Sequence, residues 1–84
     1  MKHYASSKFW ELYGALPAEV RELADKNYER LKSDPRHPSL HLKKIGDLRS
    51  VRVGAHHRAL AVEIEGGMLW FWIGTHAEYD KIVA

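Results

Sequence analysis

Several side chains that can hold a phosphate group or transfer a proton fall in the second half of the chain. Arg52 and Arg58 lie on consecutive predicted strands, and His76 follows the last strand, with Tyr79 three residues later. Arginine can stabilise charge that develops on phosphate oxygens, and an imidazole can pass protons near neutral pH. If the last three strands are adjacent, these residues could converge at one edge of a sheet. Such a set suits cleavage of a phosphodiester without a metal ion.

Other catalytic chemistries find little support. His37 and His41 have the i, i+4 spacing of a zinc-binding helix, but Pro38 lies between them. His56 and His57 are adjacent, so on a strand they would point to opposite faces. The sequence has no cysteine and no HExxH motif. We therefore expect neither a metal site nor a cofactor.

Positive charge is concentrated in the middle of the chain. Residues 34–58 carry six basic and two acidic side chains, a net charge of +4, whereas residues 59–84 have a net charge of −3. The basic segment offers further candidates for binding a polyanion, which are Lys43, Lys44, Arg49 and His57. Such a segment favours a polyanion or an acidic protein as the partner, although a solvated basic surface would have the same composition.

Two helices are predicted to support these residues from the first half of the chain. Ser6 or Ser7 can cap the first helix. Pro17 suits the first position of the second helix, which carries an apolar stripe over Val20–Leu31 and ends before Pro35. We expect the two helices to form an antiparallel hairpin.

The second half is predicted to form a sheet. Alternating and apolar runs indicate strands over residues 40–45, 50–53, 57–65 and 68–73. Gly66-Gly67 is a signal for a tight hairpin turn, and a last helical turn follows Gly74. The expected fold is α+β, with the helical hairpin packed on a twisted antiparallel sheet of about four strands. Residues 1–84 would form a single domain.

The side-chain alternation of the last two strands leaves alternatives open. Arg58 has the same parity as Leu60, which looks like a core residue. Either a β-bulge intervenes, or Ala59 faces the helices while the leucine side lines a groove. Trp70 and Trp72 share parity with His76, so they could stack on nucleotide bases or simply belong to the core.

The composition is that of a small globular protein. Hydrophobic residues make up 45% of the chain, and the absence of cysteine excludes disulfides and favours a reducing compartment. The longest apolar run, Met68–Ile73, is far shorter than the ~20 residues of a membrane-spanning helix. The first residues show no secretory signal. We expect a soluble cytoplasmic protein without a membrane partner.

The run from Pro35 to Lys81 resembles the RelE/ParE toxin superfamily of type II toxin–antitoxin modules. The resembling elements are PSLHLKKI, SVRVG, HRALAVE and WFWIGTHAEYD, which occur in the family's order and spacing. The helical hairpin around LPAEV also fits. Nuclease members of this family cut mRNA in the ribosomal A site, where the 2′-hydroxyl attacks the adjacent phosphate without a metal ion. The resemblance therefore implies a toxin whose partners are a cognate antitoxin, the ribosome and mRNA.

The resemblance also implies roles for individual residues. By position, Arg52 and Arg58 match arginines on the family's second and following strands, which implies phosphate and transition-state stabilisation. His76 and Tyr79 occupy the C-terminal region that several members use for proton transfer and base stacking. The basic patch that receives RNA corresponds to Lys43 and Lys44.

The sequence departs from the family pattern at three points. Only residues 1–5 precede the first helix, where many members have a strand. Arg49 stands at a position that is commonly aromatic, and two residues separate His76 from Tyr79, which are adjacent in some nuclease members. The ParE branch inhibits DNA gyrase without cutting RNA. A gyrase inhibitor and an inactive relic of the fold therefore remain alternatives to the nuclease.

Overall fold

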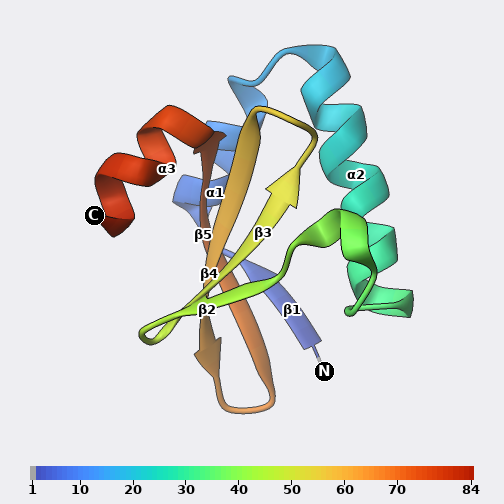
Figure 1. Ribbon diagram of the computed structural model, residues 1–84, viewed down its shortest axis with the longest axis vertical. Coiled ribbons are helices and arrows are strands. Elements are labelled where there is room, and N and C mark those ends of the chain that lie inside the picture. The colour runs from blue at the N-terminus through green and yellow to red at the C-terminus, as the bar shows by residue number, and fades with distance from the viewer. Residues whose placement is uncertain (1) are drawn as a thin grey trace.

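The computed structural model describes residues 2–84 (Figure 1). Its elements in chain order are β1 (Lys2–Ala5), α1 (Ser7–Gly14), α2 (Ala18–Ser33), the 3-10 helix η1 (Pro38–Leu40), β2 (Lys43–Ile45), β3 (Leu48–Val53), β4 (His57–Ile64), β5 (Gly67–Thr75) and α3 (His76–Val83). The predicted α+β class is confirmed. Within the described residues, no helix is long and apolar enough to cross a membrane.

The sheet has one strand more than the sequence predicted. Its order is β1-β5-β4-β3-β2, and β1 runs parallel to β5 while the other neighbours are antiparallel. The expectation of a purely antiparallel sheet of about four strands is therefore corrected to a mixed sheet of five. Four residues are too few to show a strand pattern by themselves, and β1 is held by backbone pairing with a distant strand. A strand therefore precedes the first helix, although the sequence pattern had not indicated one there.

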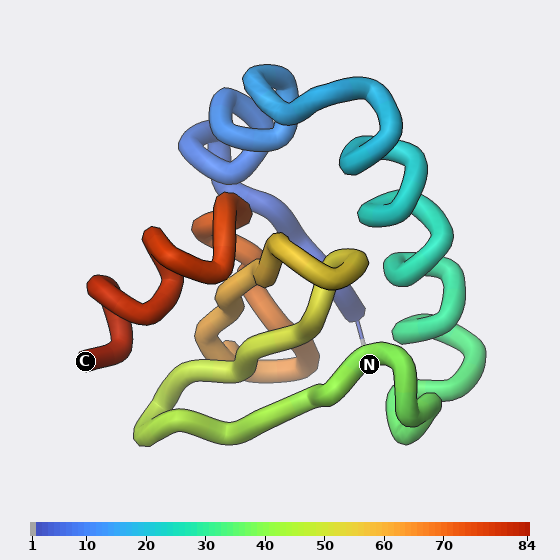
Figure 2. The backbone as a smooth tube through the Cα atoms, turned by 45° about the horizontal axis from the view of Figure 1, so that its top comes forward, coloured from blue at the N-terminus to red at the C-terminus, as the bar shows by residue number. Residues whose placement is uncertain are grey.

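The predicted N-terminal helices form, and both cover the same face of the sheet. The Ser6 hydroxyl accepts a hydrogen bond from the Phe9 amide at 3.1 Å, which caps α1 as expected. From their connecting turn the helices diverge, with α1 over β5 and α2 over β3 (Figures 1 and 2). The Tyr13 hydroxyl donates to the Asp25 carboxylate at 2.7 Å and links the helices near that turn. The two helices thus splay apart from their turn instead of lying side by side as an antiparallel hairpin (Figures 1 and 2).

The core lies between the two helices and the sheet. Val51, Ala59 and Trp70 from three neighbouring strands join Leu31 of α2 within one buried cluster. Leu40 is fully buried in this cluster, although the sequence predicted it to begin a strand. Residues 38–40 instead form η1, and the strand begins only at residue 43, because burying Leu40 takes the chain toward the helices before it reaches the sheet.

The second alternative for β4 is correct, because the strand pairs with β3 without interruption: Ala59 and Ala61 face the helices, and Arg58 shares the opposite face with Leu60. A β-bulge lies in β5 instead. The partner of Leu60 is Trp72, whereas the partner of Ala61 is Trp70, so Phe71 is an extra residue in β5. Ala61 and Trp70 belong to the core on the helix side, and Leu60 and Trp72 lie on the opposite face. The two tryptophans therefore do not share a face, as simple alternation had suggested.

Candidate functional site

Arg52 and Arg58 occupy the face of the sheet opposite α1 and α2, here called the basic face. They are directly paired across β3 and β4, and Arg58 is paired with Gly74 of β5. Only 3% of Arg58 is exposed. Its Nε donates to the Ser50 hydroxyl at 2.8 Å, and its Nη2 donates to the carbonyl of His41 at 3.0 Å. The guanidinium is therefore fixed by two hydrogen bonds from different elements.

Tyr79 of α3 covers this guanidinium. The Arg58 guanidinium carbon lies 5.0 Å from the centroid of the Tyr79 ring, and Tyr79 is itself buried. Burial lowers the pKa of Arg58, Tyr79 opposes this shift and the charge of Arg52 adds to it. Among residues 2–84, no carboxylate forms an ion pair with Arg58. Its positive charge is consequently available to attract an anion.

The transition from β5 into α3 positions the catalytic candidates of the C-terminal region. The Thr75 hydroxyl accepts from the Glu78 amide at 3.2 Å, and the Glu78 carboxylate accepts from the Thr75 amide at 3.1 Å. The Thr75 hydroxyl also donates to the Glu78 carboxylate at 2.9 Å, and the bonds from the amide and the hydroxyl of Thr75 hold the pKa of Glu78 below its usual value. The His76 amide donates to the His56 carbonyl at 2.7 Å. The capping box and this hydrogen bond set where α3 begins.

His76 lies within reach of the arginine pair through Tyr79. The two ring centroids are 5.4 Å apart, and the His76 side chain is 50% exposed. Its Nε2 lies 3.3 Å from the Asp80 carboxylate, one helical turn later. An accessible imidazole beside a carboxylate can hold its orientation and exchange protons with a ligand. The structure therefore brings all four predicted catalytic residues, Arg52, Arg58, His76 and Tyr79, into one continuous set.

Arg52 is the more accessible arginine of the pair. It is half-buried, and its Nη1 lies 3.3 Å from Nε2 of His41. Its carbonyl accepts a hydrogen bond from the Asn27 side chain at 2.8 Å, which ties this part of β3 to α2. Like Arg58, it forms no ion pair with a carboxylate in the described part of the chain.

The four residues expected to bind RNA do not lie together. Lys43 is paired with Ser50 and so falls on the basic face, whereas Lys44 is paired with Arg49 on the helix side. Arg49 forms an ion pair with Glu63. Of Lys43, Lys44 and Arg49, only Lys43 lies on the same face of the sheet as the arginine pair.

His57 is the fourth of these residues, and it also lies on the helix side. It begins β4 and is paired with Val53 and Thr75. Its nearness to the first turn of α3 contributes a smaller share of the lowered pKa of Glu78. His57 therefore lies beside the base of α3 rather than among the cations of the basic face.

Three contributors to the site were not predicted as such. Asp80 stands four residues after His76, a spacing that the sequence displays once a helix is assumed there. Ser50 and His41 contact Arg58 only because strand pairing and the left-handed turn at His41, with φ of 44°, bring them there. No local sequence pattern predicts such contacts.

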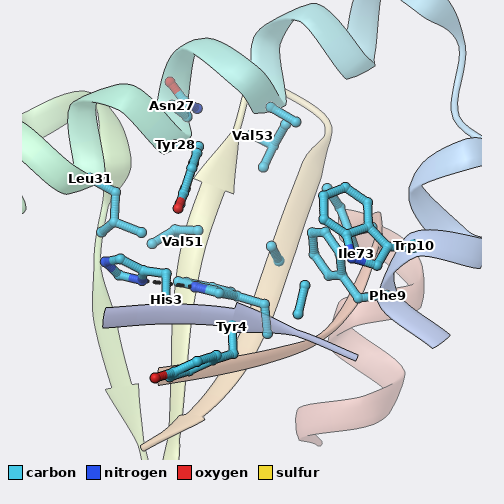
Figure 3. Close-up of a pocket in the computed structure, with 14 residues that line it drawn as sticks. His3, Tyr4, Phe9, Trp10, Asn27, Tyr28, Leu31, Val51, Val53 and Ile73 are labelled. Carbon is cyan, nitrogen blue, oxygen red and sulfur yellow. Dashed lines mark hydrogen bonds between the residues drawn. The ribbon is translucent and has the colours of Figure 1, made fainter. Parts of the chain in front are cut away.

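A cavity lies on the helix side, between the diverging arms of the hairpin and β1 (Figure 3). Its volume is ≈ 180 Å³, and its walls are mainly aromatic and aliphatic. Trp10 is 57% exposed and Tyr28 42% exposed at its rim. Within it, Trp70 Nε1 donates to His3 Nδ1 at 3.1 Å. This apolar opening, together with the basic face, leaves two dissimilar surfaces on opposite sides of the sheet.

No side chains within residues 2–84 gather as a metal site would require. No group of three or more histidine, aspartate or glutamate side chains could hold an ion there. The pairing of His76 with Asp80 contributes only two potential ligands.

The fold is similar to that of solved toxin structures. A chain of the RelB–RelE antitoxin–toxin complex from Methanococcus jannaschii superposes with a TM-score of 0.74 at 13% identity, covering 96% of this chain and 99% of that one. The isolated E. coli RelE toxin gives 0.65 at 15% identity, with coverage of 98% and 97%. An arginine-substituted mutant of E. coli RelE in the free state gives 0.65 at 17% identity, with coverage of 98% and 90%.

The similarity to these proteins is found by comparing structures. No family model matches the sequence, and no curated protein matches it significantly. The chain therefore has the RelE toxin fold over nearly its whole length, at a level of identity where fold is what the similarity establishes.

Proposed function

We propose that this protein is the toxin of a toxin–antitoxin module and that it cleaves mRNA in the ribosome without a metal ion. The observation that carries the proposal is the continuous set on the basic face, in which His76 contacts Tyr79, Tyr79 covers Arg58 and Arg58 is paired with Arg52. The similarity to RelE structures over nearly the full chain supports the choice of reaction. The protein would act in the cytoplasm, where ribosomes and mRNA are found.

In the proposed reaction, the 2′-hydroxyl of one nucleotide loses its proton and attacks the adjacent phosphorus. The bond to the 5′-oxygen of the next nucleotide breaks, and this oxygen takes up a proton. The exposed imidazole of His76, held by Asp80, transfers one of these protons. The products are a 2′,3′-cyclic phosphate and a free 5′-hydroxyl.

The two arginines would stabilise the negative charge of the phosphate in different ways. Arg52 is half-exposed and can contact the phosphate oxygens directly. Arg58 is almost fully buried, so it acts as a fixed positive charge beneath the site and as the group that positions Tyr79 and the loop at His41. Charge placed in advance of the reaction stabilises the phosphorane-like transition state without reorganisation.

Tyr79 would orient the site rather than stack on a base. Arg58 lies over its ring, and only 5% of the residue is exposed. Trp72 is half-buried on the basic face and offers the more accessible aromatic surface. Lys43 would receive the RNA backbone on the same face.

The proposed cognate antitoxin would cover the exposed apolar surface and neutralise the basic segment. The cavity of Figure 3 offers an aromatic-lined groove between the hairpin arms for a helix or extended segment. Acidic groups of the antitoxin would face the basic residues of the middle segment. Co-purification of this chain with the product of an adjacent small gene would support this partner.

One observation favours a second candidate function. Arg58 and Tyr79 are both buried, and a non-catalytic protein could use the same pair simply to dock α3 on the sheet. The basic face would then be a binding surface of a ParE-like inhibitor of DNA gyrase.

Induced expression of the wild type and of His76→Ala, with mRNA ends mapped by primer extension, separates these functions. The nuclease predicts cuts within translated codons that fall by ~10²–10³ in rate in the variant. Cuts that persist undiminished in a folded variant would contradict the role of His76. Growth arrest with intact mRNA would favour the gyrase inhibitor, and no arrest would indicate an inactive relic.

A further inference from the structure

A second recess lies at the edge of the sheet beside Arg52. It has a volume of ≈ 270 Å³ and is formed by α2, η1 and the turn between β3 and β4. Figures 1 and 2 both show that turn beside α2. The residues that line the recess, here called the edge cleft, are Leu23, Asn27, Arg30, Ser39, Arg52, Gly54 and Ala55.

Fixed contacts hold the walls of the edge cleft. Strand β2 pairs with β3 only over Leu48–Ser50, so within residues 2–84 no strand covers the edge of β3 beyond it. The Asn27 side chain donates to the carbonyl of Arg52 and joins α2 to that edge. Gly54, at φ of 65°, brings the turn so close to α2 that a Cβ there would lie 2.8 Å from a Leu23 methyl carbon. The cleft is therefore a built feature of the fold.

Two arginines, Arg30 and Arg52, line this cleft. Nη1 of Arg30 donates to the Ser39 hydroxyl at 3.1 Å and to the side-chain carbonyl oxygen of Asn27 at 3.3 Å. These contacts direct Arg30 across the cleft toward η1. Within residues 2–84, neither Arg30 nor Arg52 forms an ion pair with a carboxylate. Their remaining N–H groups can donate to an anion.

We propose that the edge cleft binds a backbone phosphate of RNA, in addition to the phosphate at the reacting position. The inference rests on the proposed function, because it assigns the new subsite to the same substrate. Arg52 belongs to both sites, so a strand held at the basic face can continue around the sheet edge to Arg30. Arginines that line a shallow recess suit a phosphodiester, whose oxygens accept several hydrogen bonds at once.

Binding of a short single-stranded RNA, made uncleavable by 2′-O-methylation, tests the edge cleft. The test variant is Arg30→Gln, which removes the charge but keeps an amide that can bond to Ser39. Lys8→Gln is the matched control, since Lys8 lies on α1 and pairs only with Glu11 among the described residues. We expect Arg30→Gln to weaken binding about tenfold. The slope of log affinity against log salt should fall by about 0.7, which corresponds to one phosphate contact on a single strand.

The outcomes separate this inference from the proposed function. If Arg30→Gln binds RNA more weakly but the wild type does not cleave mRNA, the phosphate site in the edge cleft is supported and the nuclease function is contradicted. If the wild type cleaves mRNA but Arg30→Gln and Lys8→Gln bind RNA equally well, the phosphate site in the edge cleft is contradicted and the nuclease function is supported. A wild type that does not bind the RNA would overturn the inference. Displacement of the RNA from Arg30 by inorganic phosphate at equal concentration would also overturn it, since the cleft would then be a site for free phosphate.

Discussion

The guanidinium of Arg58 lies against the ring of Tyr79, at 5.0 Å from its centroid. This contact joins β4 to α3, two elements that the chain separates by the whole of β5. Because His76 is on the first turn of α3, the same contact determines where the exposed imidazole stands relative to the arginine pair. Stability and the geometry of the candidate site therefore depend on one pair of residues, and substitutions can test both together.

Truncation of Tyr79 should loosen α3. We expect Tyr79→Ala to lower the free energy of unfolding by about 3 kcal/mol, because it removes a buried ring and its contact with a cation. Tyr79→Phe keeps the ring and should cost less than about 1 kcal/mol. Urea unfolding of both variants checks this difference. Equal stability of the two would mean that the ring contributes little to holding α3.

Replacing Arg58 with lysine should be costly although the charge is kept. A lysine cannot reproduce the two hydrogen bonds to the Ser50 hydroxyl and the His41 carbonyl, so buried polar groups lose their partners. We expect a loss of about 2 kcal/mol in unfolding free energy, measured by thermal denaturation. Arg36→Lys, at an exposed position in the loop after α2, is the matched control and should leave stability unchanged. A loss shared by the control would point to a general effect of arginine content.

His3 should make stability depend on pH. Burial lowers its pKa from 6.5, and the charge of Lys32 lowers it further. Its Nδ1 must be unprotonated to accept the hydrogen bond from Trp70. The unfolded chain therefore binds the proton more readily, so stability is fully present above pH 6.5 and is lost as the pH falls from there through the lowered pKa.

Comparison of the wild type with His3→Ala in urea, over a range of pH, isolates this contribution. The difference in unfolding free energy should be largest above pH 6.5, at about 1 kcal/mol from the hydrogen bond, and should shrink in acid. A difference that is constant with pH would contradict the assignment of the proton to His3.

Gly67 should not tolerate a side chain. A Cβ at this position would collide with the backbone carbonyl of Lys2, because β1 pairs closely alongside β5 there. We expect Gly67→Ala to cost about 2 kcal/mol, or to release β1 from the sheet. Gly14→Ala, at the end of α1 where an added methyl group would meet open space, is the control and should be neutral or slightly stabilising. Amide exchange of the β1 residues distinguishes release of the strand from a uniform loss of stability.

Local signals were enough to predict most of the elements. Ser6 caps α1, the apolar stripe of α2 has helical spacing, and the strands of the second half lie within a few residues of their predicted bounds. The predicted hairpin turn at Gly66-Gly67 is displaced, since only Gly66 has positive φ and Gly67 is the first residue of β5. The glycine at position 67 is required by its neighbour β1, and that strand has no recognisable pattern of its own.

The candidate site, too, was predicted in part from the sequence and determined in part by the tertiary structure. Residue types and strand order were enough to predict that Arg52, Arg58, His76 and Tyr79 lie together, because neighbouring strands of a hairpin bring their side chains into register. Only the tertiary structure decided that Arg49 turns away to Glu63, that Ser50 and the His41 carbonyl hold Arg58, and that Phe71 separates the faces of the two tryptophans. The physical reason is that alternation predicts a side chain's face only until a bulge shifts it. Which partner satisfies a buried charge depends on residues that are close in space and distant in the chain.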